Sequence, residues 1–87
     1  MALDLNMFYS STLDERIEIV NNSGEYITRI KYFGYFINLY IVDGDFVEVY
    51  YNCHSNDIED VEFLDPSEER LHLFTAFVDL SDLYRNI

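Results

Sequence analysis

Hydrophobic and aromatic residues gather in runs along this chain, separated by short polar stretches rich in Asn, Asp, Ser and Gly. These turn signals occupy positions 21–24, 43–45 and 52–57. Runs of β-branched and aromatic residues between turn signals are typical of β-strands. The predicted strands are about Leu13–Val20, Glu25–Val42, Phe46–Asn52 and Ile58–Leu64.

The start of the chain shows a weaker pattern. Leu3, Leu5, Met7 and Tyr9 stand at every second position, which is the spacing of one face of a strand. A short fifth strand fits this alternation, and a short helix fits it nearly as well.

The run Glu25–Val42 exceeds a typical strand of about five or six residues, and Gly34 lies near its middle. Hydrophobic positions are even-numbered before the glycine, as at Ile30, and odd-numbered after it, as at Ile37. This change of side indicates one bent strand with a β-bulge at Gly34. A tight turn at positions 33–35 is the alternative, which the apolar flanks make less favoured.

Asp43-Gly44 is a common pair in two-residue hairpin turns, yet the neighbouring pattern favours a three-residue loop. With the longer loop Leu39 faces Val49, and hydrophobic residues meet on one face of the sheet. With the shorter turn Leu39 would face Glu48. Because a slip of one residue moves every side chain to the other face, the sequence predicts the longer loop.

A helix-start signal follows the last predicted strand. Asp65 can cap the first turn, Pro66 suits the first helical position, and Glu68 completes a capping box. Hydrophobic residues then recur at spacings of three and four, which predicts an amphipathic helix ending near Asp79. The hydrophobic stripe consists of Leu71, Leu73, Phe74, Phe77 and Val78.

These elements predict an α+β fold: an antiparallel β-meander of four to five strands with one C-terminal α-helix packed on one face. At 87 residues the chain forms a single small domain, 1–87, because two independent cores would not fit in it. The face under the helix is expected to hold Ile37, Leu39, Ile41, Val47, Val49 and Tyr51.

The opposite face of the predicted sheet is also hydrophobic, although one helix cannot cover both faces. An exposed aromatic face of this kind marks an interaction surface, and a twofold axis is the commonest way to bury a self-complementary face. The sequence therefore predicts a homodimer through this face. A competing account folds the segment from Leu3 to Tyr9 over it. The predicted interaction face consists of Phe36, Tyr40, Val42, Phe46 and Tyr50.

The formal net charge is −12, from 17 acidic and 5 basic residues. Nucleic-acid phosphates and anionic membranes attract clustered Lys and Arg, so neither is an expected partner. No hydrophobic run approaches the ~20 residues of a membrane span. With one cysteine and no recognisable secretory signal, a cytoplasmic protein is expected.

Acidic residues are concentrated between Lys31 and Arg70, where the chain has no Lys or Arg. An acidic surface of this kind attracts a basic protein and speeds the encounter with it. The residues predicted to form the acidic surface are Asp57, Glu59, Asp60, Glu62, Glu68 and Glu69.

Candidate catalytic and metal-binding residues are few. Cys53 and His54 are adjacent in a polar loop, but the carboxylates that follow disfavour a reactive thiolate. His72 stands one helical turn from Glu68 and suits a weak exposed ion pair. The residues after Asp43 lack the spaced ligands of a calcium loop. No catalytic constellation, cofactor or metal is therefore predicted.

The function predicted from these observations is that of a small non-catalytic acidic interaction or adaptor protein acting through the aromatic sheet face. The alternative is an acidic inhibitor or nucleic-acid mimic of a basic protein. The second alternative is a small ligand-binding or enzymatic domain.

Overall fold

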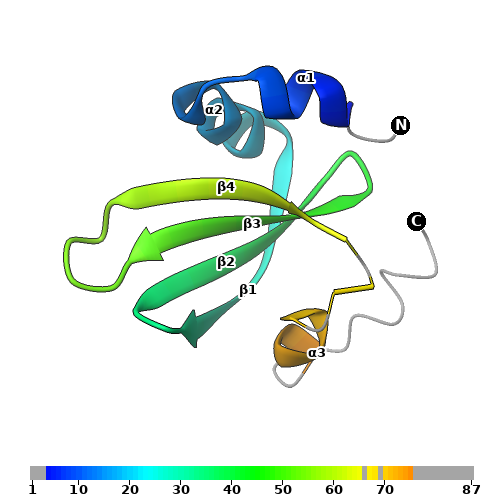
Figure 1. Cartoon of the computed structure of the whole chain (residues 1–87). Helices are drawn as coiled ribbons and strands as arrows, with labels where there is room; N and C mark the ends of the chain where they lie inside the picture. The colour runs from blue at the N-terminus through cyan, green and yellow to red at the C-terminus, as the bar shows by residue number, and fades with distance from the viewer. Residues whose placement is uncertain (1–3, 66, 69, 76–87) are drawn as a thin grey trace.

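A computed structural model describes residues 4–65, 67–68 and 70–75. In chain order this part of the molecule forms a helical hairpin, a sheet of four strands and a last short helix (Figure 1). The elements are α1 (Leu5–Ser10), α2 (Leu13–Ser23), β1 (Gly24–Tyr32), β2 (Tyr35–Val42), β3 (Asp45–Asn52), β4 (Ile58–Leu64) and α3 (Arg70–Thr75).

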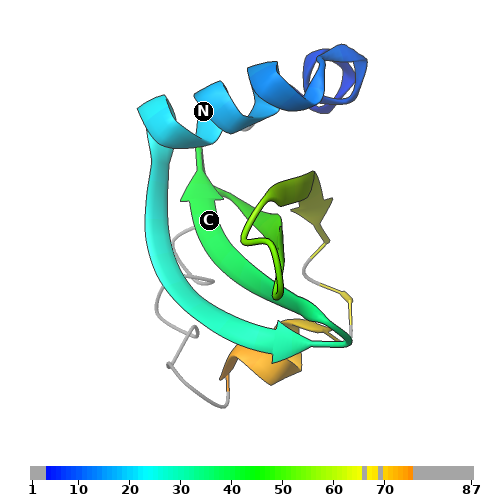
Figure 2. The same ribbon diagram turned by 90° about the vertical axis from the view of Figure 1, so that its left-hand side faces the viewer.

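The strands form an antiparallel meander in the order β1-β2-β3-β4, so each strand pairs with the next one along the chain. Helices α1 and α2, together called the helical hairpin, cover one face of the sheet, and α3 lies against the other (Figures 1 and 2). The predicted α+β class, the four-stranded meander and the helix on one face are therefore confirmed.

The stretch from Leu13 to Val20 is helical, so the strand predicted there is wrong. The Thr12 hydroxyl accepts the Glu15 N–H at 3.2 Å, and the Glu15 carboxylate accepts the Thr12 N–H at 2.9 Å. This capping box satisfies N–H groups that a helix start leaves without partners. It outweighs the β-branched composition of the segment, which by itself favours a strand. The segment before residue 10, in which hydrophobic residues alternate, is likewise helical and forms α1, which is capped by Asp4.

The change from α2 to β1 needs no loop, because the strand begins at the residue after the helix. Gly24 makes this possible. A Cβ at this position would collide with the carbonyl oxygen of Val20, so only glycine allows the chain to leave the helix at this angle. The end of α2 is thereby tied to the first strand of the sheet.

The run Glu25–Val42 is two strands joined by a turn at Phe33-Gly34, so the single bent strand is wrong and the alternative, a tight turn, is right. Both turn residues have positive φ angles, +47° and +83°, as in the type I′ turns of two-residue hairpins. Because the turn has two residues, even-numbered positions of β1 pair with odd-numbered positions of β2, as Ile30 does with Ile37. A register shift does occur, but between Tyr26 and Thr28 of β1.

The second β-hairpin also has a two-residue turn, at Asp43-Gly44, so the three-residue loop is wrong. The φ angles of both turn residues are again positive, and Leu39 lies opposite Glu48. The turn preference of the dipeptide therefore outweighs the hydrophobic pattern. As a consequence Glu48 lies on the α3 face of the sheet with a relative exposure of 0%.

The same register divides the residues that were predicted to form one exposed face. Phe46 and Tyr50 lie on the α3 side, whereas Tyr40 and Val42 pack against the helical hairpin. Phe36 is on the hairpin side as well, since it pairs with Tyr51 rather than with a residue of the α3 face. The single interaction face is therefore wrong, and the homodimer stays a prediction without the surface on which it rested.

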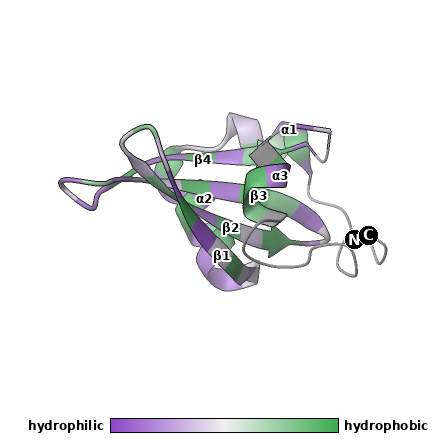
Figure 3. Ribbon diagram, turned by 90° about the horizontal axis from the view of Figure 1, so that it is seen from below, coloured by the Kyte–Doolittle hydropathy of each residue, from purple (hydrophilic) through white to green (hydrophobic). Residues whose placement is uncertain are grey.

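Two hydrophobic clusters hold the layers together, one on each face of the sheet. The cluster under α3 contains Ile30, Ile37, Leu39, Phe46, Leu64, Leu71 and Phe74. The cluster under the helical hairpin contains Phe8, Val20, Val42, Val47, Val49 and Val61. Hydrophilic segments interrupt the hydrophobic ones along β3 and β4 (Figure 3), the strands in which the sequence places several carboxylates.

The competing account, in which the N-terminal segment covers the second face, is right in part. Phe8 is fully buried in the cluster under the helical hairpin, whereas Leu5 and Met7 are exposed. Residues 1–3 lie outside the described residues. The N-terminal segment therefore contributes one large aromatic side chain to the core, and α2 contributes most of the remaining cover.

The predicted helix start at Asp65 is wrong, because Ser67 and Glu68 form a turn and α3 is described only from Arg70. The Asp65 carboxylate accepts the Ser67 N–H and hydroxyl, each at 2.9 Å. Leu71 and Phe74 are buried as predicted, while Leu73 is exposed and not part of the stripe. Pro66, Phe77, Val78 and the predicted helix end near Asp79 lie outside the described residues.

Candidate interaction surfaces

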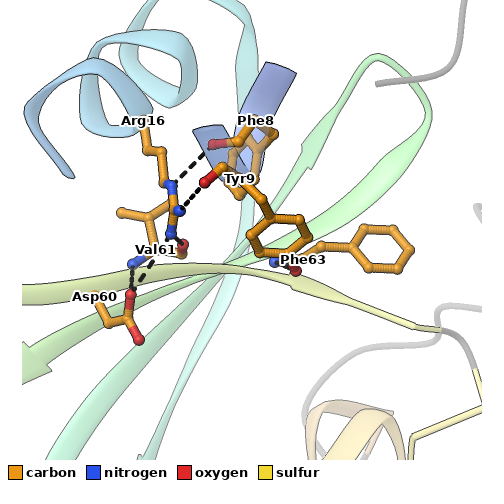
Figure 4. A network of polar contacts seen from close by, with 6 residues as sticks. All are labelled: Phe8, Tyr9, Arg16, Asp60, Val61 and Phe63. Atoms are coloured by element: carbon orange, nitrogen blue, oxygen red, sulfur yellow. Dashed lines mark hydrogen bonds and ion pairs between the residues drawn. The ribbon is translucent and has the colours of Figure 1, made fainter. Parts of the chain in front are cut away.

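Arg16 joins the helical hairpin to strand β4 (Figure 4). Its guanidinium donates to three main-chain carbonyls: Nε to Phe8 at 3.0 Å, Nη2 to Tyr9 at 3.1 Å and Nη1 to Val61 at 3.1 Å. It also lies 5.2 Å from the ring centroids of Phe8 and of Tyr9. The side chain is only 15% exposed, so the one Lys or Arg of the helical hairpin is directed inward.

Side chains close the outer edge of β4. The Val61 N–H donates to the Asp60 carboxylate at 2.9 Å, the Val61 carbonyl accepts from Arg16, and the Phe63 N–H donates to the Tyr9 hydroxyl oxygen at 3.2 Å (Figure 4). An edge strand uses such groups to pair with a further strand. Both outward main-chain groups of Val61 and the N–H of Phe63 are therefore already hydrogen-bonded.

Three carboxylates lie near one another on β3 and β4. Glu48 pairs with Glu62 across the strands, Asp60 is two residues before Glu62, and the Tyr50 hydroxyl donates to Glu48 at 3.0 Å. Burial raises the pKa of Glu62 to about 7, together with the hydrogen bond and the negative charge of Asp60. The Glu62 carboxyl therefore gains and loses its proton near neutral pH.

The basic residues of β1 stand at the opposite edge of the sheet from β4. The Arg29 guanidinium lies 5.0 Å from the ring centroid of Phe36 and 5.2 Å from that of Tyr51. Its Nε donates to the buried Asn38 side chain at 2.6 Å. Lys31, two residues further along, is exposed. Positive charge is thus held on the β1 side.

A groove of about 400 Å³ lies on the outer surface of the helical hairpin. Its hydrophobic lining comes from Met7 of α1 and Ile19 of α2, and its acidic lining from Glu15 and Glu18. Asn22 and Ser23, at the end of α2, complete one side. The groove lies on the side of α2 away from Ile17 and Val20, which pack against the sheet, and Ile19 both lines the groove and touches the hydrophobic cluster beneath α2.

The predicted acidic surface lies mainly along β4 and the turn before it. Asp57 and Glu59 are exposed, whereas Asp60 and Glu62 are half-buried. The Glu59 carboxylate also accepts the Asn52 side-chain amide at 2.8 Å. Glu68 is exposed between β4 and α3, and Glu69 lies outside the described residues.

The structure adds acidic residues that the sequence analysis missed, those of α2. Asp14, Glu15 and Glu18 are exposed, and they were overlooked because the segment was taken as a strand. The signal that could have found them is the spacing of Thr12 and Glu15, which is that of a capping box. The role of Arg16 had no such signal, since one of its partners is 45 residues away in the sequence.

The remaining candidates are placed as follows. Cys53 is half-buried and His54 exposed in the turn between β3 and β4, where the His54 N–H donates to the Asn52 side chain at 2.8 Å. Asp43 belongs to a β-hairpin turn, and His72 is exposed on α3. Among the described residues, no three His, Cys, Asp or Glu side chains are arranged to hold a metal ion.

None of the helices in the described part of the chain is long and apolar enough to cross a membrane. No protein-family model, curated protein or solved structure matches the chain. The interpretation of function therefore rests on the charges and surfaces described above.

Proposed function

We propose that the protein is a small non-catalytic interaction protein that binds a basic protein partner through its acidic side. The acidic side comprises the exposed surfaces of α2 and β4 and the turn before β4. Its carboxylates are those of Asp14, Glu15, Glu18, Asp57, Glu59, Asp60 and Glu62. The proposal is for a cytoplasmic protein, since a single cysteine forms no disulfide within the chain.

The observation that carries this proposal is the internal use of Arg16. The Arg16 guanidinium pairs with Asp60 at 4.0 Å and already donates to three carbonyls. Arg29 and Lys31 stand on the far edge of the sheet. Uncompensated negative charge on one side attracts a basic protein and orients it during the encounter.

The closed edge of β4 supports the same interpretation. Because Tyr9, Arg16 and Asp60 occupy three of its outward main-chain groups, the addition of a partner strand is disfavoured at this place. The acidic side therefore presents side chains rather than a main-chain edge. The aromatic sheet face that was predicted to act as the binding surface is divided and largely covered within the subunit.

A photo-crosslinking experiment in the native host tests the proposal. The photoreactive residue p-benzoylphenylalanine replaces Asn22 on the acidic side or, as the matched control, Tyr26, which is exposed on β1. We expect the Asn22 position, and not the Tyr26 position, to capture a basic protein, and the yield to fall as sodium chloride is added. Capture of the same proteins at both positions, or of none at Asn22, would overturn the proposal.

A further inference from the structure

We infer that the groove between α1 and α2 is the contact point on the acidic side, and that it receives a lysine or arginine side chain from a basic segment of the partner. This inference rests on the proposed function and names the place and the chemistry of the contact. It is carried by two properties of the groove: a hydrophobic floor and a negative rim.

The floor of the groove suits the aliphatic part of a long basic side chain. Met7 is 54% exposed there, and Ile19 lines the groove beside it. Lys and Arg pack their methylene stems on hydrophobic surface while the charged head stays near polar groups. The volume of about 400 Å³ falls within the range of ligand pockets, about 300–1,000 Å³. The groove can therefore hold one such side chain and part of the segment that carries it.

The rim of the groove supplies negative charge from two sources. Glu15 and Glu18 line it, and hydrogen bonds from Thr12 lower the pKa of Glu15, so that this carboxylate stays ionised. The last turn of α2 contains no basic residue, so the partial negative charge of the helix end is uncompensated near Asn22 and Ser23. Arg16 is directed to the other side of α2, toward β4.

Other occupants fit the groove less well. A hydrated metal ion would have to lie against the hydrophobic side chains of Met7 and Ile19, which offer it no ligand. A second copy of this chain would bring another net charge of −12 to a negative surface. A basic segment matches both the floor and the rim.

The test measures the binding of a fluorescein-labelled amphipathic helical peptide of Leu and Lys to the full chain by fluorescence anisotropy. The double substitution Glu15→Gln and Glu18→Gln neutralises the rim, and Gln at position 15 can still form a capping box. The matched control, Asp57→Asn with Glu59→Gln, removes the same charge elsewhere on the acidic side. We expect the rim variant to weaken binding by about tenfold and the control by less than about threefold.

Two further measurements separate the groove from general charge attraction. Met7→Gln keeps the length of the side chain but makes the floor polar, and we expect it to weaken binding severalfold without loss of helical circular dichroism. The same peptide with acetylated lysines should not bind, because acetylation removes the charge. Binding of the acetylated peptide with unchanged affinity would overturn the inference.

The outcomes also distinguish this inference from the proposed function. If the rim variant and the control weaken binding equally, the groove is not the contact point, while crosslinking from Asn22 to a basic protein would still support the proposed function. If the wild-type chain does not bind the charged peptide, the inference fails. The proposed function then fails as well only if the crosslinking also captures no basic protein.

Discussion

The two edges of the sheet are protected against further strand pairing in different ways. At β4, side chains of Tyr9, Arg16 and Asp60 bind the outward main-chain groups. At β1, the strand is interrupted by a register shift and carries the exposed residues Arg29 and Lys31. Bulges and exposed charges on edge strands are common devices against edge-to-edge association.

This difference between the edges explains why positive and negative charges lie on different sides of this small acidic molecule. Closing β4 by hydrogen bonds directs Arg16 inward, where it pairs with Asp60 at 4.0 Å and is only 15% exposed, and leaves the exposed carboxylates of α2 and of the turn before β4 without this positive charge. The charged residues that protect the β1 edge, Arg29 and Lys31, remain exposed at the opposite edge of the sheet. The acidic side on which the proposed function depends is thus a consequence of how its edge is closed.

The largest effect is expected from Arg16→Met. The substitution leaves three carbonyl groups without their donor in a half-buried place, and we expect the free energy of unfolding to fall by about 3 kcal/mol. Urea denaturation followed by far-ultraviolet circular dichroism measures this. The matched variant on the other edge, Arg29→Met, should cost less, about 1–2 kcal/mol, because it loses one hydrogen bond, to the Asn38 side chain, and two cation–π contacts. Equal losses would contradict the difference between the edges.

The next effect concerns pH. The pKa of Glu62 is about 7 in the folded protein and near 4.5 in the unfolded chain, so the folded state binds more protons between these values. Its contribution to stability is therefore complete below about pH 4.5 and is lost as the pH rises through 7. Allowing for solvent screening at this partly exposed site, we expect a loss of about 1–2 kcal/mol.

Urea denaturation at pH 5 and pH 8 measures this change. Glu62→Gln should remove most of the difference and stabilise the protein at pH 8, whereas Glu68→Gln, at an exposed position, should not. Below about pH 4 the trend reverses, because hydrogen bonds lower the pKa values of Glu15, in the capping box of α2, and of Asp65, in the turn before α3, and protonation then weakens those contacts. A wild-type stability that does not change between pH 5 and 8 would contradict the assignment.

The meander was predictable because turn residues separate runs of strand-forming residues, and such local signals do not depend on distant contacts. The errors arose where two local signals disagreed. At Leu13–Val20 the β-branched composition opposed the capping box, and at Asp43-Gly44 the hydrophobic alternation opposed the turn type. In both places the specific backbone geometry, and not the composition, decided the structure.

The candidate surfaces were less predictable than the fold. The carboxylates of β4 could be expected from the absence of Lys and Arg around them. The groove of the helical hairpin could not, since it requires α2 to be a helix and α1 to lie beside it. The network of Arg16 joins residues that are 8 and 45 positions away, and no spacing in the sequence indicates such contacts.

A smaller effect is expected from Tyr9→Phe, which opens the β4 edge at one point. The substitution removes the hydroxyl that accepts the Phe63 N–H, and we expect a loss of about 1 kcal/mol. Hydrogen exchange measured by NMR should become faster at the Phe63 amide and change little in β2. Tyr26→Phe is the matched control on β1, where no described main-chain group binds the hydroxyl. Exchange at Phe63 that does not change would mean that Tyr9 does not close the edge.

The smallest effect on the folded subunit is expected from Lys31→Val. After the register shift, Thr28–Tyr32 is the regular part of β1, and there Arg29 and Lys31 would come close to the same charges of a second copy paired antiparallel. Valine removes one of these charges and favours strand pairing, so self-association should increase relative to the wild type at the same concentration, as measured by sedimentation velocity. Glu59→Val also replaces an edge charge by valine, but on β4, where Tyr9, Arg16 and Asp60 bind the neighbouring main-chain groups. This variant should therefore not associate more than the wild type, and equal association of both variants would show that the β4 edge is as open as β1.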